Sequence, residues 1–191
     1  AEYGTLMHYA FGVFLTTGEF DFDSTGEFIN NAISQGVIGG SYREPSWEED
    51  INSDVAAFAQ WVVDYQVLPM AIELVLVSKH GYGTAIDLVC EMCVEQPALD
   101  YDNPYKTGPS KGEPREVKIK KNITALINFK SGRKGFYEEH EVQLEFERMV
   151  FEENYPHIKV DAIYNWSPKE WITTPGYNFK DQSESLNRDK A

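Results

Sequence analysis

One stretch decides the fold, residues 115–151, which reads REVKIKKNITALINFKSGRKGFYEEHEVQLEFERMVF. In residues 115–129 apolar side chains take every second position, apart from Lys121, and polar side chains take most of the others. This period of two is typical of a half-buried strand. Residues 131–134 are polar and predict a turn, and residues 136–147 alternate again between apolar residues and glutamates. We therefore predict a long β-hairpin over residues 115–151.

Pairing Phe129 with Phe136 sets the register of this hairpin. Opposite charges then face each other on one side of the hairpin, and apolar side chains meet on the other. The predicted cross-strand pairs are Lys118–Glu147, Lys120–Glu145, Ile119–Phe146 and Ile123–Val142. Each opposite-charge pair contributes about 0.2–1 kcal/mol. A slip of one residue would turn the apolar set outward, so the register is well specified.

Further strands are predicted on both sides of this hairpin. Alternation favours a first strand over residues 7–15. Residues 72–77 and 86–94 alternate about a glycine-containing turn and indicate a second hairpin. Residues 158–166 alternate again and predict a further antiparallel strand.

Two helices are expected near the N-terminus. Ser24 with Glu27, and Ser46 with Glu49, match the capping-box pattern that begins a helix. The first predicted helix spans residues 25–35 and ends at Gly36. The second spans residues 47–66, with an apolar stripe at spacings of three and four. Its stripe consists of Ile51, Val55, Phe58, Val62 and Tyr65. We interpret Asp54 and Asp64 as acids on the solvated side of this helix.

The predicted fold class is α+β. We expect an antiparallel sheet of about six strands, with the hairpin 115–151 at its centre and the two helices packed on it. Residues 1–167 form a single domain in this interpretation. Residues 96–114 contain four prolines and two glycines, and we expect an extended loop or arm there. Residues 168–191 are expected to form an extended C-terminal tail.

Composition limits the classes of function. The chain of 191 residues has 31 acidic and 17 basic side chains, a net charge of −14. This charge disfavours binding to nucleic acids or membranes. No run of eighteen apolar residues predicts a membrane span, and the first residues do not resemble a signal peptide. The two cysteines do not make a disulfide framework. We expect synthesis in a reducing cytoplasm.

No motif predicts catalysis, a cofactor or a metal site. Cys90 and Cys93 match C-x-x-C, but on a strand their sulfur atoms would lie on opposite faces, and zinc would need further ligands. An enzyme using His140 with Glu138 is a third-ranked hypothesis, since no nucleophile is positioned beside them. We predict that the protein is not an enzyme, and the sequence identifies no small-molecule ligand.

The preferred hypothesis is a non-enzymatic structural subunit of a larger assembly, with a viral or phage virion as the favoured kind. Residues 1–64 contain eleven acidic residues and one basic residue, whereas residues 106–134 contain nine of the seventeen basic ones. Such polarity suits contacts between different faces of neighbouring copies or other subunits. The predicted interface residues are Lys106, Lys111, Trp171, Tyr177 and Phe179.

The alternative hypothesis is an acidic inhibitor that mimics nucleic acid and binds a basic site on a nucleic-acid enzyme. A mimic needs an exposed, continuous stripe of carboxylates. The residues that would form it are Glu48, Glu49, Asp50, Asp54 and Asp64.

Overall fold

The structure is a computed structural model that describes residues 2–41, 43–133, 136 and 138–183. The fold is α+β, as predicted, with helices α1–α4, one short 3-10 helix and a five-stranded sheet. The elements in chain order are α1 (Glu2–Thr17), η1 (Phe22–Ser24), α2 (Thr25–Ser34), α3 (Trp47–Asp64), β1 (Leu68–Val77), β2 (Gly83–Asp100), β3 (Arg115–Phe129), α4 (Glu138–Asn154), β4 (Ala162–Pro168) and β5 (Tyr177–Asp181). None of the described helices combines the length and apolarity needed to cross a bilayer.

The sheet is mixed, with the strand order β1-β2-β3-β4-β5. β1 with β2, β2 with β3, and β4 with β5 are antiparallel, whereas β3 and β4 are parallel. Parallel neighbours need a crossover connection, because the chain must return to the same end of the sheet. Here the crossover contains α4.

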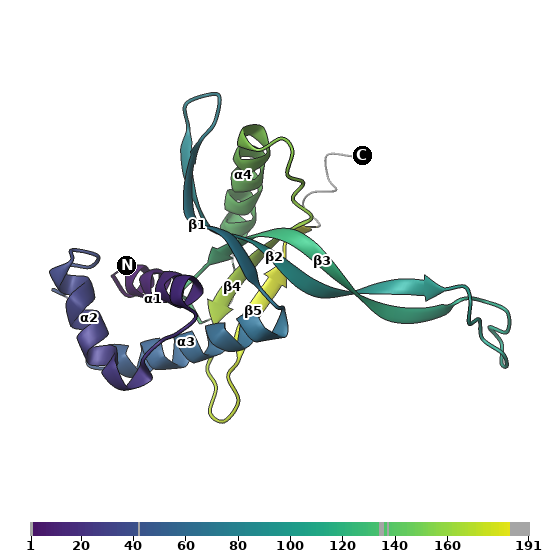
Figure 1. The fold of residues 1–191 in the computed structure, drawn as a ribbon, viewed down its shortest axis with the longest axis horizontal. Coiled ribbons are helices and arrows are strands. Elements are labelled where there is room, and N and C mark those ends of the chain that lie inside the picture. The colour runs from purple at the N-terminus through teal and green to yellow at the C-terminus, as the bar shows by residue number, and fades with distance from the viewer. Residues whose placement is uncertain (1, 42, 134–135, 137, 184–191) are drawn as a thin grey trace.

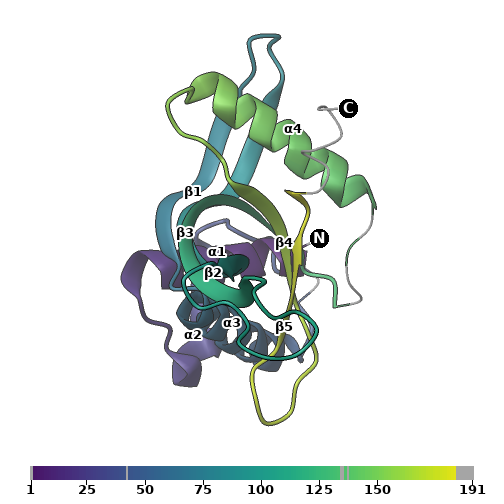
Figure 2. The same cartoon turned by 90° about the vertical axis from the view of Figure 1, so that its right-hand side faces the viewer.

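Helices cover both faces of this sheet. α1, α2 and α3 lie on one side, and α4 lies on the other beside the β1–β2 hairpin (Figures 1 and 2). The first layer encloses an aromatic core in which Phe11 stacks on Phe58 at a centroid distance of 4.0 Å, with Trp166 and Phe129 edge-on to both. The second layer packs Leu144, Val150 and Phe151 of α4 on the opposite face.

The predictions for two helices and one hairpin are confirmed. α2 and α3 match the predicted ranges 25–35 and 47–66 closely, and β1 with β2 forms the hairpin predicted over residues 72–94. Gly36 has a φ of 73°, which is the left-handed conformation expected at a helix end. The side chains of Ser24 and Ser46, however, make no capping hydrogen bond.

The predicted first strand is a helix. α1 buries Leu6, Met7, Ala10 and Phe11, which recur at helical spacing. The same residues also fit a loose alternation, because nearly every position from 6 to 15 is apolar. Since both periods fit such a sequence, alternation alone was not diagnostic.

The second half of the predicted central hairpin is also wrong. Residues 138–154 form α4, so the predicted pairs between β3 and residues 136–147 do not exist. β3 pairs instead with β2, where Ile119 faces Gln96. α4 turns Leu144 and Glu147 inward and leaves Val142 and Phe146 exposed. A glutamate on the buried side and apolar residues on the outer side conceal the helical period.

Three further boundaries differ from the predictions. β2 extends to Asp100, so the predicted loop 96–114 shortens to residues 101–114. β4 starts at Ala162 and is parallel to β3. Residues 177–181 of the predicted tail form β5, which completes the sheet beside β4. The sheet therefore has five strands of mixed direction, and not about six antiparallel ones.

Candidate interaction site: the β2–β3 arm and the pocket at its base

The most distinctive feature is a two-stranded arm, residues 93–122, which projects away from the helices (Figure 1). β1 pairs with β2 only as far as Glu91, and β4 pairs with β3 only from Ala125 onward. In the described structure, residues 93–100 and 115–122 therefore pair with each other alone. Residues 101–114 form the tip.

One face of the arm continues the face of the sheet that α1–α3 cover. Met92 and Ile123 pair within the core, and the next pairs on this face are Val94 with Lys121, Gln96 with Ile119, and Ala98 with Val117. Exposure rises sharply along β3, from 4% at Ile123 to 46% at Ile119. The apolar stripe of β3 is thus longer than the layer of helices that covers it.

The other face of the arm is polar. Lys120 pairs with Glu95 and Lys118 with Pro97 along the strands. The ammonium group of Lys118 lies 3.7 Å from the Glu95 carboxylate, with both side chains largely exposed. Exposed pairs of this kind contribute little to stability. Polar contacts along this face therefore do not explain why the arm is extended.

The tip places the predicted interface residues Lys106 and Lys111 at the far end of the arm, and both are exposed. Backbone hydrogen bonds between Tyr105 and both Gly112 and Glu113 close the tip, and the Arg115 guanidinium lies 5.4 Å from the centre of the Tyr105 ring. Tyr101 is exposed beside them. The tip is therefore an ordered loop that presents amines and phenol rings together.

A pocket of about 570 Å³ lies at the base of the arm, and we call it the base pocket. The end of α3, the first residues of the arm, β4 and β5 enclose it. Its lining residues are Asp64, Tyr65, Gln66, Cys93, Val94, Glu95, Lys120, Tyr164, Tyr177, Phe179 and Asp181. A hydrogen bond of 2.7 Å from the Cys93 backbone N–H to the Tyr65 carbonyl fixes the arm to the end of α3.

The lining of the base pocket is aromatic and acidic. Tyr164 stacks on Phe179 at 4.3 Å, and the Tyr177 hydroxyl donates a 2.7 Å hydrogen bond to Asp64. Burial raises the pKa of Tyr164 and of Tyr177, and the nearby charges of Asp181 and Asp64, respectively, raise them further. These carboxylates therefore impose a negative potential on the pocket.

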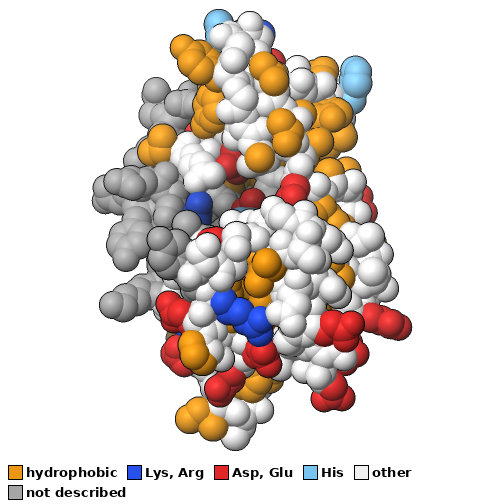
Figure 3. Space-filling view, turned by 90° about the vertical axis from the view of Figure 1, so that its left-hand side faces the viewer, with side chains coloured by type: hydrophobic (Ala, Val, Ile, Leu, Met, Phe, Trp, Pro, Cys, Tyr) orange, Lys and Arg blue, Asp and Glu red, His pale blue; other side chains and the backbone are white. Residues whose placement is uncertain are grey.

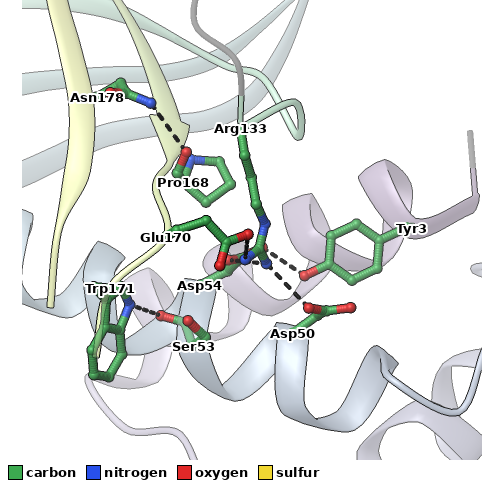
Figure 4. A network of polar contacts seen from close by, with 9 residues as sticks. All are labelled: Tyr3, Asp50, Ser53, Asp54, Arg133, Pro168, Glu170, Trp171 and Asn178. Atoms are coloured by element: carbon green, nitrogen blue, oxygen red, sulfur yellow. Dashed lines mark hydrogen bonds and ion pairs between the residues drawn. The ribbon is translucent and has the colours of Figure 1, made fainter. Parts of the chain in front are cut away.

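A second polar site joins four separate segments at the opposite end of α3 (Figure 4). Arg133, in the connection after β3, donates to Asp54 at 2.8 Å and to Asp50 at 3.3 Å. It also reaches Glu170 at 3.1 Å, while the Tyr3 hydroxyl donates to Asp54 at 2.6 Å. α1, α3 and the connections after β3 and β4 are thereby held together.

Asp54 is fully buried, which corrects its interpretation as a solvated acid. Burial raises the pKa of Asp54 to about 6, although the hydrogen bond from Tyr3 and the charge of Arg133 both act to lower it. Removing one partner of a buried charge pair leaves the other uncompensated. The network thus acts as a structural clamp between these segments.

Two more carboxylates are of interest, the partly buried Asp87 of β2 and the buried Glu147 of α4. Asp87 accepts a 2.6 Å hydrogen bond from the Phe129 N–H and lies 3.5 Å from His8. Glu147, only 1% exposed, accepts from Gln143 at 2.7 Å and has one oxygen without a hydrogen-bond partner. Burial raises the pKa of Glu147 to about 7 and also raises that of Asp87.

The remaining predicted residues have these positions. Tyr177 and Phe179 are half-buried on β5, and Trp171 donates a 3.2 Å hydrogen bond to the Ser53 carbonyl. All three pack against the chain's own core. The side chains of Glu138 and His140 lie outside the described residues.

The two cysteines are on opposite faces of β2, and burial raises the pKa of Cys90 to about 12. Over the described ranges, His, Cys, Asp and Glu side chains nowhere form a group of three or more that could hold a metal ion. The base pocket and the Arg133 clamp were not predicted from the sequence, because both combine segments that are far apart in the chain.

Comparisons with known proteins give no relative: no family model, no curated protein and no solved structure matches this chain.

Proposed function

We propose that this protein is a non-enzymatic structural subunit of a larger assembly, in which the arm of one subunit packs on its neighbour. A viral or phage virion is the kind of assembly that we favour. The observation that carries the proposal is the mainly apolar face of the arm, which continues the core stripe of β3 past Lys121 to Ile119 and Val117, beyond its own covering helices.

Energetics support a partner for this face. Isolated two-stranded ribbons are marginally stable in water, and ordering each residue costs about 1–2 kcal/mol of backbone entropy. Fully burying an exposed aliphatic side chain contributes about 1.5–3 kcal/mol, and covering the partly exposed Val117 and Ile119 contributes a share of this for each. A neighbour that covers this face therefore supplies stabilisation that the arm lacks by itself.

Charge supports the same proposal. The arm contains six basic and five acidic side chains, a net charge of +1, so the rest of the chain has a net charge of −15. Acidic side chains gather over the part of the body where α1–α3 lie, and hydrophobic ones gather over the β1–β2 hairpin (Figure 3). A neutral arm meets less repulsion from an acidic neighbour than a second acidic surface would.

The placement of the candidate mimic residues does not favour the inhibitor hypothesis. Asp54 is buried, Glu48 pairs with Arg43, and Asp50 pairs with Arg133. A continuous exposed stripe at phosphate spacing would need these carboxylates to be free.

Arm truncation tests the proposal. Replacing residues 97–118 by Asn-Gly leaves Gln96 and Ile119 as the last pair before a two-residue turn. We expect wild-type protein to self-associate between about 1 and 100 µM and the truncated variant to be monomeric. Light scattering after size exclusion measures both masses.

The matched control changes exposed apolar residues outside the arm, with Val75→Thr and Tyr82→Ser on the β1–β2 hairpin. We expect this variant to keep the wild-type mass. A wild-type protein that stays monomeric across the range, or a truncated variant with wild-type association, would overturn the proposal.

A further inference from the structure

The base pocket has the chemistry of a site for a cation. Asp64, Glu95 and Asp181 contribute three carboxylates, and Lys120 is the single basic residue among its described lining residues. Three tyrosines and one phenylalanine supply aromatic rings. Aromatic faces attract an ammonium or guanidinium group within about 6 Å of the ring centre, and nearby carboxylates add to this attraction.

We propose that the base pocket of one copy binds a lysine side chain from the arm tip of a second copy. This inference rests on the proposed function and names the surface that receives the arm. Lys106 and Lys111 are the candidate lysines, since both are exposed at the tip.

Position and ion pairs together favour these two lysines: in the described structure Lys120, Lys121 and Lys169 also lack an ion pair, but they do not lie at the tip. Arg43, Lys79 and Lys118 each have a carboxylate of their own chain within 4.0 Å. Within the described structure, neither Lys106 nor Lys111 has one. Their charges are therefore available to a partner, and Tyr101 beside them adds exposed apolar surface.

Geometry requires that the lysine comes from another copy. The strands of the arm run outward from Val94 at the base pocket to Asp100 at the tip. Six residues of extended strand span about 20 Å, and Figure 1 shows the tip at the far end of the arm from the body. A tip that enters the pocket of the next copy makes a contact between two different surfaces, and repetition of this contact builds a ring or a filament.

Two charge-reversed variants test this contact. The tip variant carries Lys106→Glu and Lys111→Glu, and the pocket variant carries Glu95→Lys and Asp181→Lys. All four positions are exposed, so the fold should tolerate the changes. We expect each variant alone to associate at least about tenfold more weakly than wild type in sedimentation velocity, because like charges meet at the contact.

Mixing the two variants gives the sharper result. The pocket variant retains wild-type lysines at its tip, and the tip variant retains a wild-type pocket. We expect complexes that contain both variants to form at the same protein concentrations at which the wild-type protein associates. The matched control carries Glu19→Lys and Asp23→Lys, which change the charge equally at exposed sites on the body, and it should associate at least as well as wild type.

Three results separate the two proposals. Pocket and tip variants that associate like wild type, while arm truncation gives monomers, would overturn the lysine contact and leave the proposed function standing. Weak association that mixing does not restore would also overturn the contact. If truncation itself has no effect, the proposed function fails together with the contact. Circular dichroism melts of each variant establish that the folds are intact.

Discussion

The inner and outer halves of β3 have the same alternating pattern but different surroundings. In the inner half, residues 123–129, every side chain except Thr124 is buried between the two helical layers. In the outer half, residues 115–122, no side chain is buried, although Val117 and Ile119 continue the same stripe. The alternation shows that one face of a strand avoids water, but it does not show which molecule covers that face.

Polar contacts also differ between the two halves. At the end of the inner half, the Phe129 N–H donates a hydrogen bond to the partly buried Asp87, and Arg133 soon after it forms an ion pair with Asp54 of α3. The outer half has one exposed ion pair, Lys118 with Glu95. Contacts within the same chain therefore hold the inner half of β3 in place, whereas the outer half is available to a partner.

The largest expected effect on stability comes from a substitution in the inner half of β3. Ile127 is fully buried between Leu88 and Tyr164. Ile127→Ala should lower the free energy of unfolding by about 2–5 kcal/mol, because it removes buried methyl groups and leaves a cavity. Urea unfolding measures the change. A loss below about 1 kcal/mol would contradict the assignment of this half to the core.

The clamp after the inner half comes next. Asp54→Ala should lower the free energy of unfolding by about 3 kcal/mol, because Arg133 and the Tyr3 hydroxyl lose their buried acceptor. Asp64→Ala, on an exposed residue of the same helix, is the matched control and should cost much less. Equal losses of unfolding free energy in the two variants would contradict a specific contribution of the clamp to stability.

Replacing Glu147, the buried acid of α4, should raise the free energy of unfolding, in contrast to the two losses above, and this gain should depend on pH. The pKa of Glu147 is raised to about 7 from its usual value near 4.5, so the folded state binds this proton more tightly than the unfolded state does. Its contribution to stability is therefore present below about pH 4.5 and is lost as the pH rises to 7.

Glu147→Gln should consequently increase the free energy of unfolding at pH 7 by about 1–3 kcal/mol and change it little at pH 4. Thermal melts between these pH values measure the difference. Glu145→Gln, two residues away in the same helix and paired with Arg148, should not reproduce it. If Glu147→Gln is destabilised at pH 7, this would contradict the claim that burying the charged carboxylate destabilises the folded state.

The smallest effect on stability should come from the outer half. Ile119→Thr should change the free energy of monomer unfolding by less than about 0.5 kcal/mol, because the side chain is already half exposed. The same change should weaken self-association, measured by sedimentation velocity. A large loss of monomer stability would show that the arm packs on its own body.

The sequence predicted elements well where hydrophobic residues followed one clear period. α3 shows this, since Ile51, Val55 and Phe58 lie on its buried side. The prediction for α4 failed because Glu147 takes an inward position while Val142, Phe146 and Met149 are exposed. Its abundance of Glu, Leu, Gln, Arg and Met was the available helical signal, through intrinsic propensity.

The candidate site was only partly predictable. The exposed lysines of the tip, Lys106 and Lys111, follow from the sequence of one loop. The base pocket joins the end of α3, the arm, β4 and β5, and no local pattern brings these segments together. Asp54 did carry a signal, because it lies three residues after Ile51 and so within the apolar stripe of α3.

Amide hydrogen exchange along the arm, read by mass spectrometry at dilute and at assembling concentrations, tests the central claim most directly. We predict that peptides from residues 93–122 exchange fast in the monomer and more slowly in the assembly, whereas residues 123–129 are protected in both. An assembly whose arm exchanges as fast as that of the monomer would contradict the claim that a neighbouring subunit covers the outer half of β3.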